Sequence, residues 1–412
     1  MMENNKIDRK LYIWLIASSF IFYLMSISIK MVYSAELVSI ISHFNTSKSI
    51  ASLGLTIYYL IYALTQLIIS SSKIKLDMYK FLIYTTIPSA LSFGAIIFAN
   101  DIWQVWGVLA LNGILQSSIY GGIMHQLTKY LPDTWFNLTS IILSFAFALG
   151  TAIAYGISAL GVAFLNWKYA FVIFAVLLLL SLIVFCAVLR CCKRHFGDGS
   201  AVEKATDIDT PALQQNVSKR KMFAIMSFIL VTNFLVCCLY YGATNWVPSL
   251  LKEIHDVPES YSLLITISVP LTMSPGPMLA NYYTEKTGKV YTVCSVFFAV
   301  CAVCMLTMIF VYDLHIVLAI AISLIMLFFN RAIVNLLTSY LPFKLNKVID
   351  ASKSSMMINA IACIGAAAMP FITGVIMDNL GWTAYYICMF GIAALTTVIF
   401  MFGMKYSKKL LP

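Results

Sequence analysis

Long apolar segments alternate with short polar segments along almost the whole chain. Each apolar segment has about 20 residues or more, which is enough for an α-helix to cross about 30 Å of hydrocarbon. Because a backbone inside lipid must satisfy its own hydrogen bonds, the pattern predicts an all-α membrane protein with 12 transmembrane helices. The predicted helices cover about residues 11–42, 49–70, 80–99, 102–130, 136–163, 167–190, 222–250, 261–283, 290–312, 315–341, 353–378 and 382–404.

One polar stretch divides this pattern into two equal parts. Residues 191–221 are rich in charged side chains, contain Gly and Pro, and have no sustained apolar run. Six apolar segments precede this stretch and six follow it. We therefore predict an N-terminal six-helix bundle over residues 1–190, a cytoplasmic linker over 191–221 and a C-terminal six-helix bundle over 222–412.

Landmarks in the first part of the chain recur in the second part. Transporters built from internal repeats show such symmetry and bind substrate near the membrane midplane, where the repeats meet. The recurrence therefore predicts two pseudo-symmetric bundles with the fold of such a transporter. The matched pairs are Tyr130-Leu131-Pro132 with Tyr340-Leu341-Pro342 at an offset of 210, and Gly150 with Gly365 and Trp167 with Trp382 at an offset of 215.

Two local patterns refine the predicted helices. Segments 136–163 and 353–378 are rich in small residues, which lets another helix approach closely. Segment 261–283 contains Pro270, Pro275 and Pro277, which predict kinks.

Composition and charge agree with a membrane protein. The chain is 61% hydrophobic and 11% charged, whereas a soluble chain has about 25% charged residues. The net charge of +10 does not indicate a nucleic-acid partner, because 22 of the 27 Lys and Arg lie in segments on one predicted side. This positive-inside bias places both termini in the cytoplasm of a multi-pass protein in the plasma (inner) membrane.

The motifs of several enzyme classes are absent from the sequence. No Gly-rich loop is followed by Lys and Ser or Thr, so nucleotide hydrolysis is not expected. The 10 cysteines include no pattern typical of a metal site, and Cys301 and Cys304 are interpreted as small core residues. We expect no enzyme activity, no cofactor and no metal, and we expect a monomer.

Lys30 is the first candidate functional residue, because it lies about 20 residues into the first helix. A charged side chain inside a membrane costs several kcal/mol unless it has a partner or a wet cavity, and such residues are functional by default. We interpret Lys30 as an anion-binding cation in a central cavity. The alternatives are a structural ion pair with Glu36 and a lysine that extends to the membrane surface.

Two further charged residues lie within predicted helices. Arg331, in segment 315–341, can clamp a carboxylate or phosphate through two parallel hydrogen bonds, or it can lock its own helix by local pairing. Glu36 is the candidate for proton coupling, because burial raises the pKa of a carboxyl group. Six residues separate it from Lys30, which places the two on different faces of a straight helix.

Neutral polar residues form a second group of candidates. Asn112, Gln116 and Tyr120 are spaced four residues apart and form one polar stripe on a helix. Together with Tyr240, Tyr241 and Asn245 they are predicted to line a substrate cavity. Interhelical hydrogen bonding is the alternative for this group. Tyr58, Tyr59, Tyr62 and Gln66 have a spacing that permits a wet helix face.

Four short stretches, spread over both parts of the chain, resemble motifs of a known family. They are Leu239–Glu253 (LYYGATNWVPSLLKE), Gly113–Tyr120 (GILQSSIY), Asn166–Phe171 (NWKYAF) and Thr373–Trp382, which begins with TG and ends with DNLGW. Through them the chain resembles the major facilitator superfamily, and within it the organophosphate:inorganic phosphate antiporters. The resemblance implies a secondary transporter with the major facilitator fold.

The departures from that family concern the phosphate-binding residues. In the phosphate antiporters, an arginine on helix 1 and another on helix 7 grip the phosphoryl group. Here Lys30 stands at the first position, without the two-pronged guanidinium, and Tyr240 stands at the second. Phe147 stands near the place of the helix 5 histidine of glycerol-phosphate carriers, and Ser72–Asp77 keeps the charge but not the glycines of the motif between helices 2 and 3. A phosphate dianion would need a second cation, and Arg331 is the candidate.

These observations predict a secondary active transporter that moves a small organic anion, an organophosphate or a carboxylate, by alternating access. Antiport or a proton gradient would drive it, and its expected partners are the anionic substrate and the lipid bilayer. One alternative is a transporter-like membrane sensor of sugar phosphates, which the same family includes and which signals to a partner kinase. Another alternative is an efflux carrier for neutral amphiphiles.

Overall fold

The computed structural model describes residues 2–71, 77–197, 219–341 and 351–410, and every regular element within these ranges is helical. The first half of the chain forms α1 (Met2–Ala35), α2 (Leu37–Phe44), α3 (Lys48–Ser71), α4 (Met78–Gly94) with the short η1 (Ala95–Phe98), α5 (Ile102–Gln116), α6 (Ile119–Tyr130), α7 (Asp133–Phe164) and α8 (Trp167–Phe196). The second half forms α9 (Lys219–Thr244), α10 (Val247–Glu253), α11 (Glu259–Thr266), α12 (Ser268–Met273), α13 (Gly276–Thr287), α14 (Val290–Val311), α15 (Ile316–Asn335), η2 (Leu336–Tyr340) and α17 (Ala351–Leu410).

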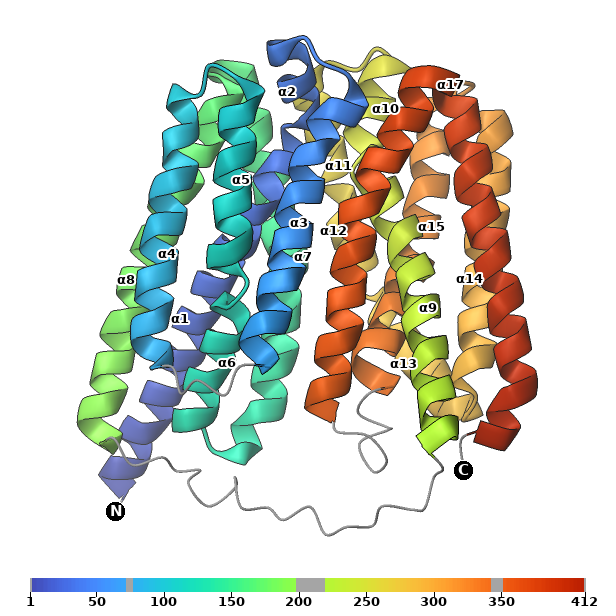
Figure 1. Ribbon diagram of the computed structural model, residues 1–412. Coiled ribbons are helices and arrows are strands. Elements are labelled where there is room, and N and C mark those ends of the chain that lie inside the picture. Colours follow the sequence, from blue (N-terminus) through green and yellow to red (C-terminus); the bar gives the residue numbers. More distant parts are fainter. Residues whose placement is uncertain (1, 72–76, 198–218, 342–350, 411–412) are drawn as a thin grey trace.

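The two halves lie side by side, with their long helices roughly parallel (Figure 1). We call the end of the molecule at which both chain termini lie the terminal end, and the opposite end, which carries α2 and α10, the far end (Figure 1). Of the predicted linker, residues 191–196 belong to α8 and 219–221 belong to α9, while 198–218 lie outside the described residues.

Ten stretches of the described chain are long and apolar enough to span a membrane. One of them, Met357–Gly403, contains two of the predicted helices, because α17 bends at Gly381, where φ is +80°. The predicted helix 102–130 is absent from the ten because it is divided into α5 and α6. With these two additions the structure has the 12 helices expected from the sequence.

Several helices that were predicted to be continuous are broken in the structure. The first breaks at Glu36, the fourth at Ser117-Ser118 and the seventh at Asn245-Trp246. The kinks predicted from the prolines are confirmed, since segment 261–283 is divided into α11, α12 and α13. Broken helices are tolerated where the freed backbone groups are buried in protein or line a cavity.

The halves repeat one close helix contact. A Cβ on Gly150 of α7 would lie 2.9 Å from the Leu24 carbonyl oxygen of α1, so only glycine allows this approach. The counterpart Gly365 of α17 lies against α9, where a Cβ would meet Cys237 Cβ at 3.2 Å. Small residues therefore allow a close helix contact at corresponding places in both bundles, which confirms the predicted pseudo-symmetry.

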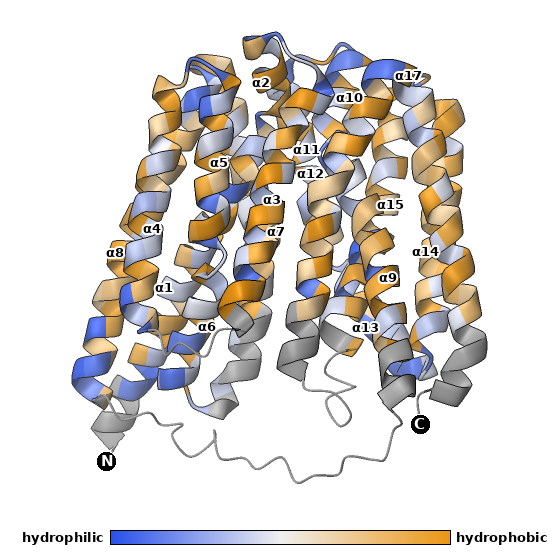
Figure 2. Cartoon of the chain, viewed as in Figure 1, coloured by the Kyte–Doolittle hydropathy of each residue, from blue (hydrophilic) through white to orange (hydrophobic). Residues whose placement is uncertain are grey.

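Apolar side chains cover the outside of the bundle. Phe98, Trp103 and Ile183 are 80%, 72% and 63% exposed. Figure 2 shows hydrophobic colour along the middle of the helices and hydrophilic colour mainly near their ends. Such a surface fits a hydrocarbon environment.

Candidate functional site

A small cavity lies between the two halves. Its walls come from α1, α3 and α7 of the first half and from α9 and α12 of the second. The space open to the centres of water molecules is ≈ 20 Å³, about enough for one water. The lining residues are Met31, Ser34, Tyr59, Phe147, Thr151, Tyr155, Tyr240, Tyr241, Thr244, Asn245, Pro270 and Met273.

Lys30 contacts two aromatic rings of α3, and neither Lys30 nor these rings line the cavity. Its Nζ lies 4.2 Å from the ring centroid of Tyr62 and 5.9 Å from that of Tyr58, both on α3. Within the described part of the chain, no carboxylate lies within ion-pairing distance of Lys30. The predicted alternative of an ion pair with Glu36 is therefore wrong for this conformation.

Arg331 on α15 also lies over aromatic rings, and these rings come from both halves. Its guanidinium carbon is 4.6 Å from the ring centroid of Phe147 on α7 and 5.8 Å from that of Tyr240 on α9. Both rings line the central cavity. Among residues 2–71, 77–197, 219–341 and 351–410, no carboxylate forms an ion pair with Arg331.

A chain of tyrosine rings connects the surroundings of the two cations and crosses between the halves. Tyr59 on α3 and Tyr241 on α9 form the crossing contact, with ring centroids 5.6 Å apart. The neighbouring contacts are Tyr62–Tyr58 at 6.0 Å, Tyr58–Tyr59 at 5.2 Å and Tyr241–Tyr240 at 5.0 Å. The ring contacts thus run without a gap from the rings under Lys30 to a ring under Arg331.

Three of the predicted site residues, Tyr240, Tyr241 and Asn245, line the cavity. The Asn245 side chain is tied to both halves. Its Oδ1 accepts a hydrogen bond from the Ser34 hydroxyl of α1, and its Nδ2 donates to the Tyr241 carbonyl oxygen at 2.8 Å. Separation of the halves would therefore break the hydrogen bond between Ser34 and Asn245.

The predicted stripe on the fourth helix lies elsewhere. Asn112 Oδ1 accepts from Ser89 at 2.6 Å and Asn112 Nδ2 donates to Ser92 at 2.9 Å, so this amide joins α5 to α4. Gln116 Oε1 accepts from the Tyr58 hydroxyl at 3.0 Å. Neither amide lines the cavity, but Gln116 fixes one of the rings that faces Lys30.

Tyr120, the third member of the stripe, contacts Tyr23 of α1, with ring centroids 5.0 Å apart. It is 43% exposed and does not line the cavity either. The helix is broken between Gln116 and Ile119, so the four-residue spacing of the stripe does not place Tyr120 on the face that carries Asn112 and Gln116.

Several lining residues were not singled out from the sequence as site residues. Thr151 and Tyr155 of α7 and Met273 of α12 are examples. Tyr59 belonged to the tyrosine group whose spacing permits a wet face, and that spacing was the available signal. The others carry no charge and follow no polar stripe, so nothing in the sequence marked them.

Glu36 lies at the break between α1 and α2 and has no exposed surface. The Ser39 hydroxyl lies 3.0 Å from Glu36 Oε2 and also contacts Glu259 Oε1 of α11. Glu36 Oε1 has no hydrogen-bond partner among the described residues. This group is separate from the central cavity and joins the two halves at the far end.

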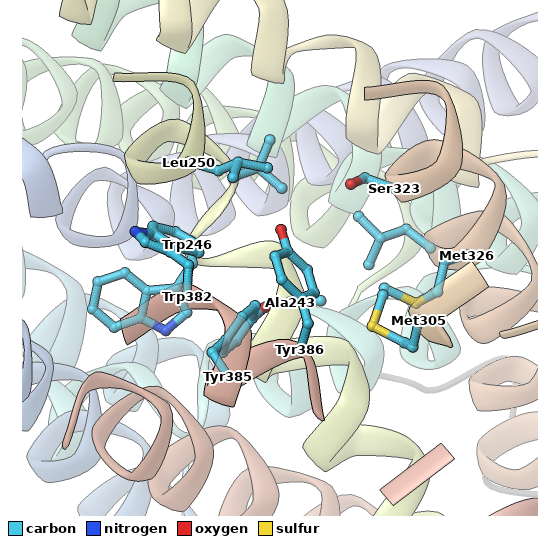
Figure 3. A pocket seen from close by; sticks show the side chains of 11 residues that line it. Ala243, Trp246, Leu250, Met305, Ser323, Met326, Trp382, Tyr385 and Tyr386 are labelled. Atoms are coloured by element: carbon cyan, nitrogen blue, oxygen red, sulfur yellow. The ribbon is translucent and has the colours of Figure 1, made fainter. Parts of the chain in front are cut away.

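A second cavity lies within the C-terminal half (Figure 3). Trp246, Trp382, Tyr385 and Tyr386 face it, together with Met305 and Met326. Its volume for the centres of water molecules is ≈ 10 Å³, and no charged side chain lines it. We interpret it as a packing gap inside one bundle.

Comparison with solved structures shows which proteins share this fold. A bacterial homologue of the human lysosomal transporter Spinster, in an inward-facing and unoccupied conformation, matches with a TM-score of 0.74 at 14% identity, over 97% of this chain and 97% of that chain. The nucleoside transporter NupG matches with a TM-score of 0.70 at 14% identity, over 96% and 99%. A POT family transporter in complex with a thioalcohol-conjugated peptide matches with a TM-score of 0.70 at 12% identity, over 96% and 96%.

A search of curated protein sequences finds no match. The family model of the Major Facilitator Superfamily matches residues 15–349, which is most of the chain. A match of that length, together with the shared fold, shows the family. The chain belongs to the Major Facilitator Superfamily and is a multi-pass membrane protein, a secondary transporter rather than an enzyme.

Proposed function

We propose that this transporter carries a small organic anion, an organophosphate or a carboxylate, by alternating access of its two halves. The observation that carries the proposal is the pair of cations, Lys30 and Arg331, that lie against aromatic rings without a carboxylate partner among the described residues. The rings under Arg331 line the central cavity, and the rings under Lys30 are connected to it through Tyr59. The driving force is exchange for a second anion or a proton gradient.

The energetics of these two cations support an anionic cargo. A contact between a cation and an aromatic face contributes about 0.5–2 kcal/mol, whereas a buried charge inside a membrane costs several kcal/mol. The rings therefore offset only part of the cost. An anion that enters the cavity would supply the missing negative charge, and the tyrosine walls suit an organic body better than a bare inorganic ion.

The position of Arg331 supports the resemblance to the phosphate antiporters. In that family, cationic or titratable residues stand on helices 5 and 7 at positions that correspond here to Phe147 and Tyr240. Arg331 comes from another helix, yet its guanidinium lies over these two rings. Arg331 would thus place a positive charge in the same region from a different helix. Its planar guanidinium can bind a phosphate or carboxylate through two parallel hydrogen bonds.

Contacts between the halves favour alternating access. At the far end, Lys48 forms an ion pair with Glu253 at 2.8 Å, and Asp378 accepts hydrogen bonds from the backbone nitrogens of Lys48 and Ser49. These polar contacts can break and re-form as the halves rock. With both termini in the cytoplasm of the plasma (inner) membrane, the far end is the outer end, and the conformation described is closed to the outside.

The test is counterflow into vesicles that contain the purified full chain, with panels of radiolabelled organophosphates and carboxylates. We expect the wild type to exchange at least one anion, and Lys30→Ala and Arg331→Ala to reduce that exchange by about tenfold or more, the loss expected for a hydrogen bond to a charged group. Lys286→Ala is the matched control, because it removes a lysine that lies over the Tyr282 ring, 5.7 Å away, outside the cavity.

Unchanged anion exchange in both Lys30→Ala and Arg331→Ala would refute the proposal. Binding of a sugar phosphate without any exchange would instead favour the sensor. Transport of neutral amphiphiles alone, unaffected by either substitution, would favour the efflux carrier.

A further inference from the structure

Two carboxyl groups, one from each half, share a single hydroxyl at the far end. Ser39 Oγ lies 3.0 Å from Glu36 Oε2 and in hydrogen-bond contact with Glu259 Oε1. A hydroxyl has one proton to donate, so it can serve only one carboxylate at a time. Both contacts are favourable only if one of the two carboxyl groups carries a proton and donates it to Ser39.

The surroundings decide which carboxyl group carries the proton. Glu259 Oε2 forms an ion pair with Lys252 Nζ at 2.8 Å, which favours the ionised form of Glu259. Glu36 has no exposed surface and no cation within ion-pairing distance among the described residues. The proton therefore belongs to Glu36, which donates to Ser39, and Ser39 donates to Glu259.

We propose that Glu36 is the proton-binding group of the transport cycle, and that its proton closes the far end by completing the bridge from Glu36 through Ser39 to Glu259. The inference rests on the proposed alternating access. Loss of the proton would leave two carboxylates facing one hydroxyl, and their repulsion would push α2 away from α11. Proton release would in this way be linked to opening.

The groups that face Glu36 are few. From its own segment there is Ser39, from α11 there is Glu259, and from α7 there is Ser158. Lys252 of α10 reaches Glu259 and, at 3.4 Å, the Ser42 hydroxyl. The Ser158 hydroxyl is close enough to the Glu36 carboxyl group to favour its ionised form, although neither Ser158 Oγ nor Glu36 Oε1 has a well-formed hydrogen bond among the described residues. No side chain other than Lys252 brings positive charge to this group within the described ranges.

The pKa of Glu36 agrees with this assignment. Glu36 lies one residue beyond the candidate span Asp8–Ala35. Burial raises its pKa from 4.5 to about 8, although the Ser158 and Ser39 hydroxyls act in the opposite direction and lower it, and repulsion from Glu259 adds a smaller rise. Opening exposes the group to water and returns the pKa toward its ordinary value. The closed form is then favoured at low pH, and this advantage is lost as the pH rises through about 8.

The linkage has a measurable size. Between the ordinary pKa of 4.5 and the raised pKa of about 8, the ratio of closed to open molecules falls by up to about tenfold per pH unit, because one proton separates the two forms. Hydrogen exchange of the full chain in lipid nanodiscs, without substrate, reports this ratio. The relevant amides are those of Leu37–Phe44 and Val247–Glu253, with rates normalised to the intrinsic exchange rate at each pH.

In the wild type, we expect the protection of these amides from exchange to fall as the pH rises from 4.5 to about 8. In Glu36→Gln, a neutral mimic of the protonated acid, we expect the amides to remain protected with no pH dependence. The control Glu253→Gln removes the ion pair with Lys48 at the same end. In Glu253→Gln, the protection of the same amides should be lower than in the wild type at every pH, but it should change with pH as steeply as in the wild type. Infrared spectra of the wild type should also show a carboxylic acid band that disappears above pH about 8 and is missing in Glu36→Gln.

Wild-type pH dependence in Glu36→Gln, or no carboxylic acid band at neutral pH, would overturn the proposal. A change in protection with sodium concentration at fixed pH that Glu36→Gln abolishes would also overturn it, since a metal cation would then be the ligand. Because no substrate is present, these results do not depend on Lys30 or Arg331. Failure of the anion proposal and failure of the proton proposal are therefore distinguishable.

Discussion

Asp378 caps a helix of the opposite half, and its removal should shift the balance between closed and open forms. The residue lies on α17, yet its carboxylate accepts hydrogen bonds from Lys48 N at 3.1 Å and Ser49 N at 2.8 Å, the first backbone groups of α3. These amides have no partner within their own helix, and the positive end of the helix dipole favours a carboxylate there. Opening of the far end would break both bonds.

The expected magnitude follows from helix capping. Replacement of a capping Asp by Ala costs about 0.5–2 kcal/mol. Asp378 is exposed, so water replaces part of what is lost, and we take about 1 kcal/mol. Because the bonds exist only in the closed form, Asp378→Ala should lower the closed-to-open ratio about fivefold.

Hydrogen exchange at the amides of Lys48–Ala51 measures this effect. Asp77→Ala is the matched control, because Asp77 caps α4 in the same way, through Tyr79 N at 3.1 Å and Lys80 N at 3.3 Å, but within one half. It should destabilise α4 without change at the far end. Equal protection of Lys48–Ala51 in Asp378→Ala and wild type would refute the reasoning that this cap holds the halves together.

Two further predictions concern close contacts of glycine. Gly374→Val should hold the far end open, because a Cβ at this position would lie 2.9 Å from Ser49 N and 3.0 Å from the Lys48 carbonyl carbon. Faster exchange of Leu37–Phe44 amides is the expected result, and wild-type exchange would contradict it. Gly150→Val should lower the thermal unfolding temperature, because its Cβ would meet the Leu24 carbonyl oxygen at 2.9 Å, and overpacking costs about 1–3 kcal/mol. Gly107→Ala, with no atom within 4 Å of the new Cβ, is the control, and equal unfolding temperatures for both variants would count against a tight contact between α1 and α7.

The fold could be predicted from the sequence because a backbone inside lipid can adopt few structures. Each apolar segment of sufficient length must form a helix, and the division around residues 191–221 predicted the two bundles. The breaks at Glu36 and Ser117-Ser118 were not predicted, since no proline or glycine marks them. Their position depends on which helices pack alongside.

The candidate site could be predicted only in part. Lys30 and Arg331 are conspicuous in sequence because charge is rare within apolar segments, and Tyr240, Tyr241 and Asn245 were found near them. Asn112 and Gln116 were equally conspicuous, but their amides bond to Ser89, Ser92 and Tyr58 inside one bundle. A polar stripe reveals that a helix has a special face, but not which neighbour that face meets.

What the sequence by itself determined is the class of molecule and the number of its membrane helices, because hydropathy acts along the chain. Only the tertiary structure decided that Arg331 lies over a ring of the opposite half, and that Glu36 shares the Ser39 hydroxyl with Glu259 instead of pairing with Lys30. Helix rotation and the approach of segments that are far apart in the sequence set these contacts. Their free energies arise from packing and desolvation, which no local pattern encodes.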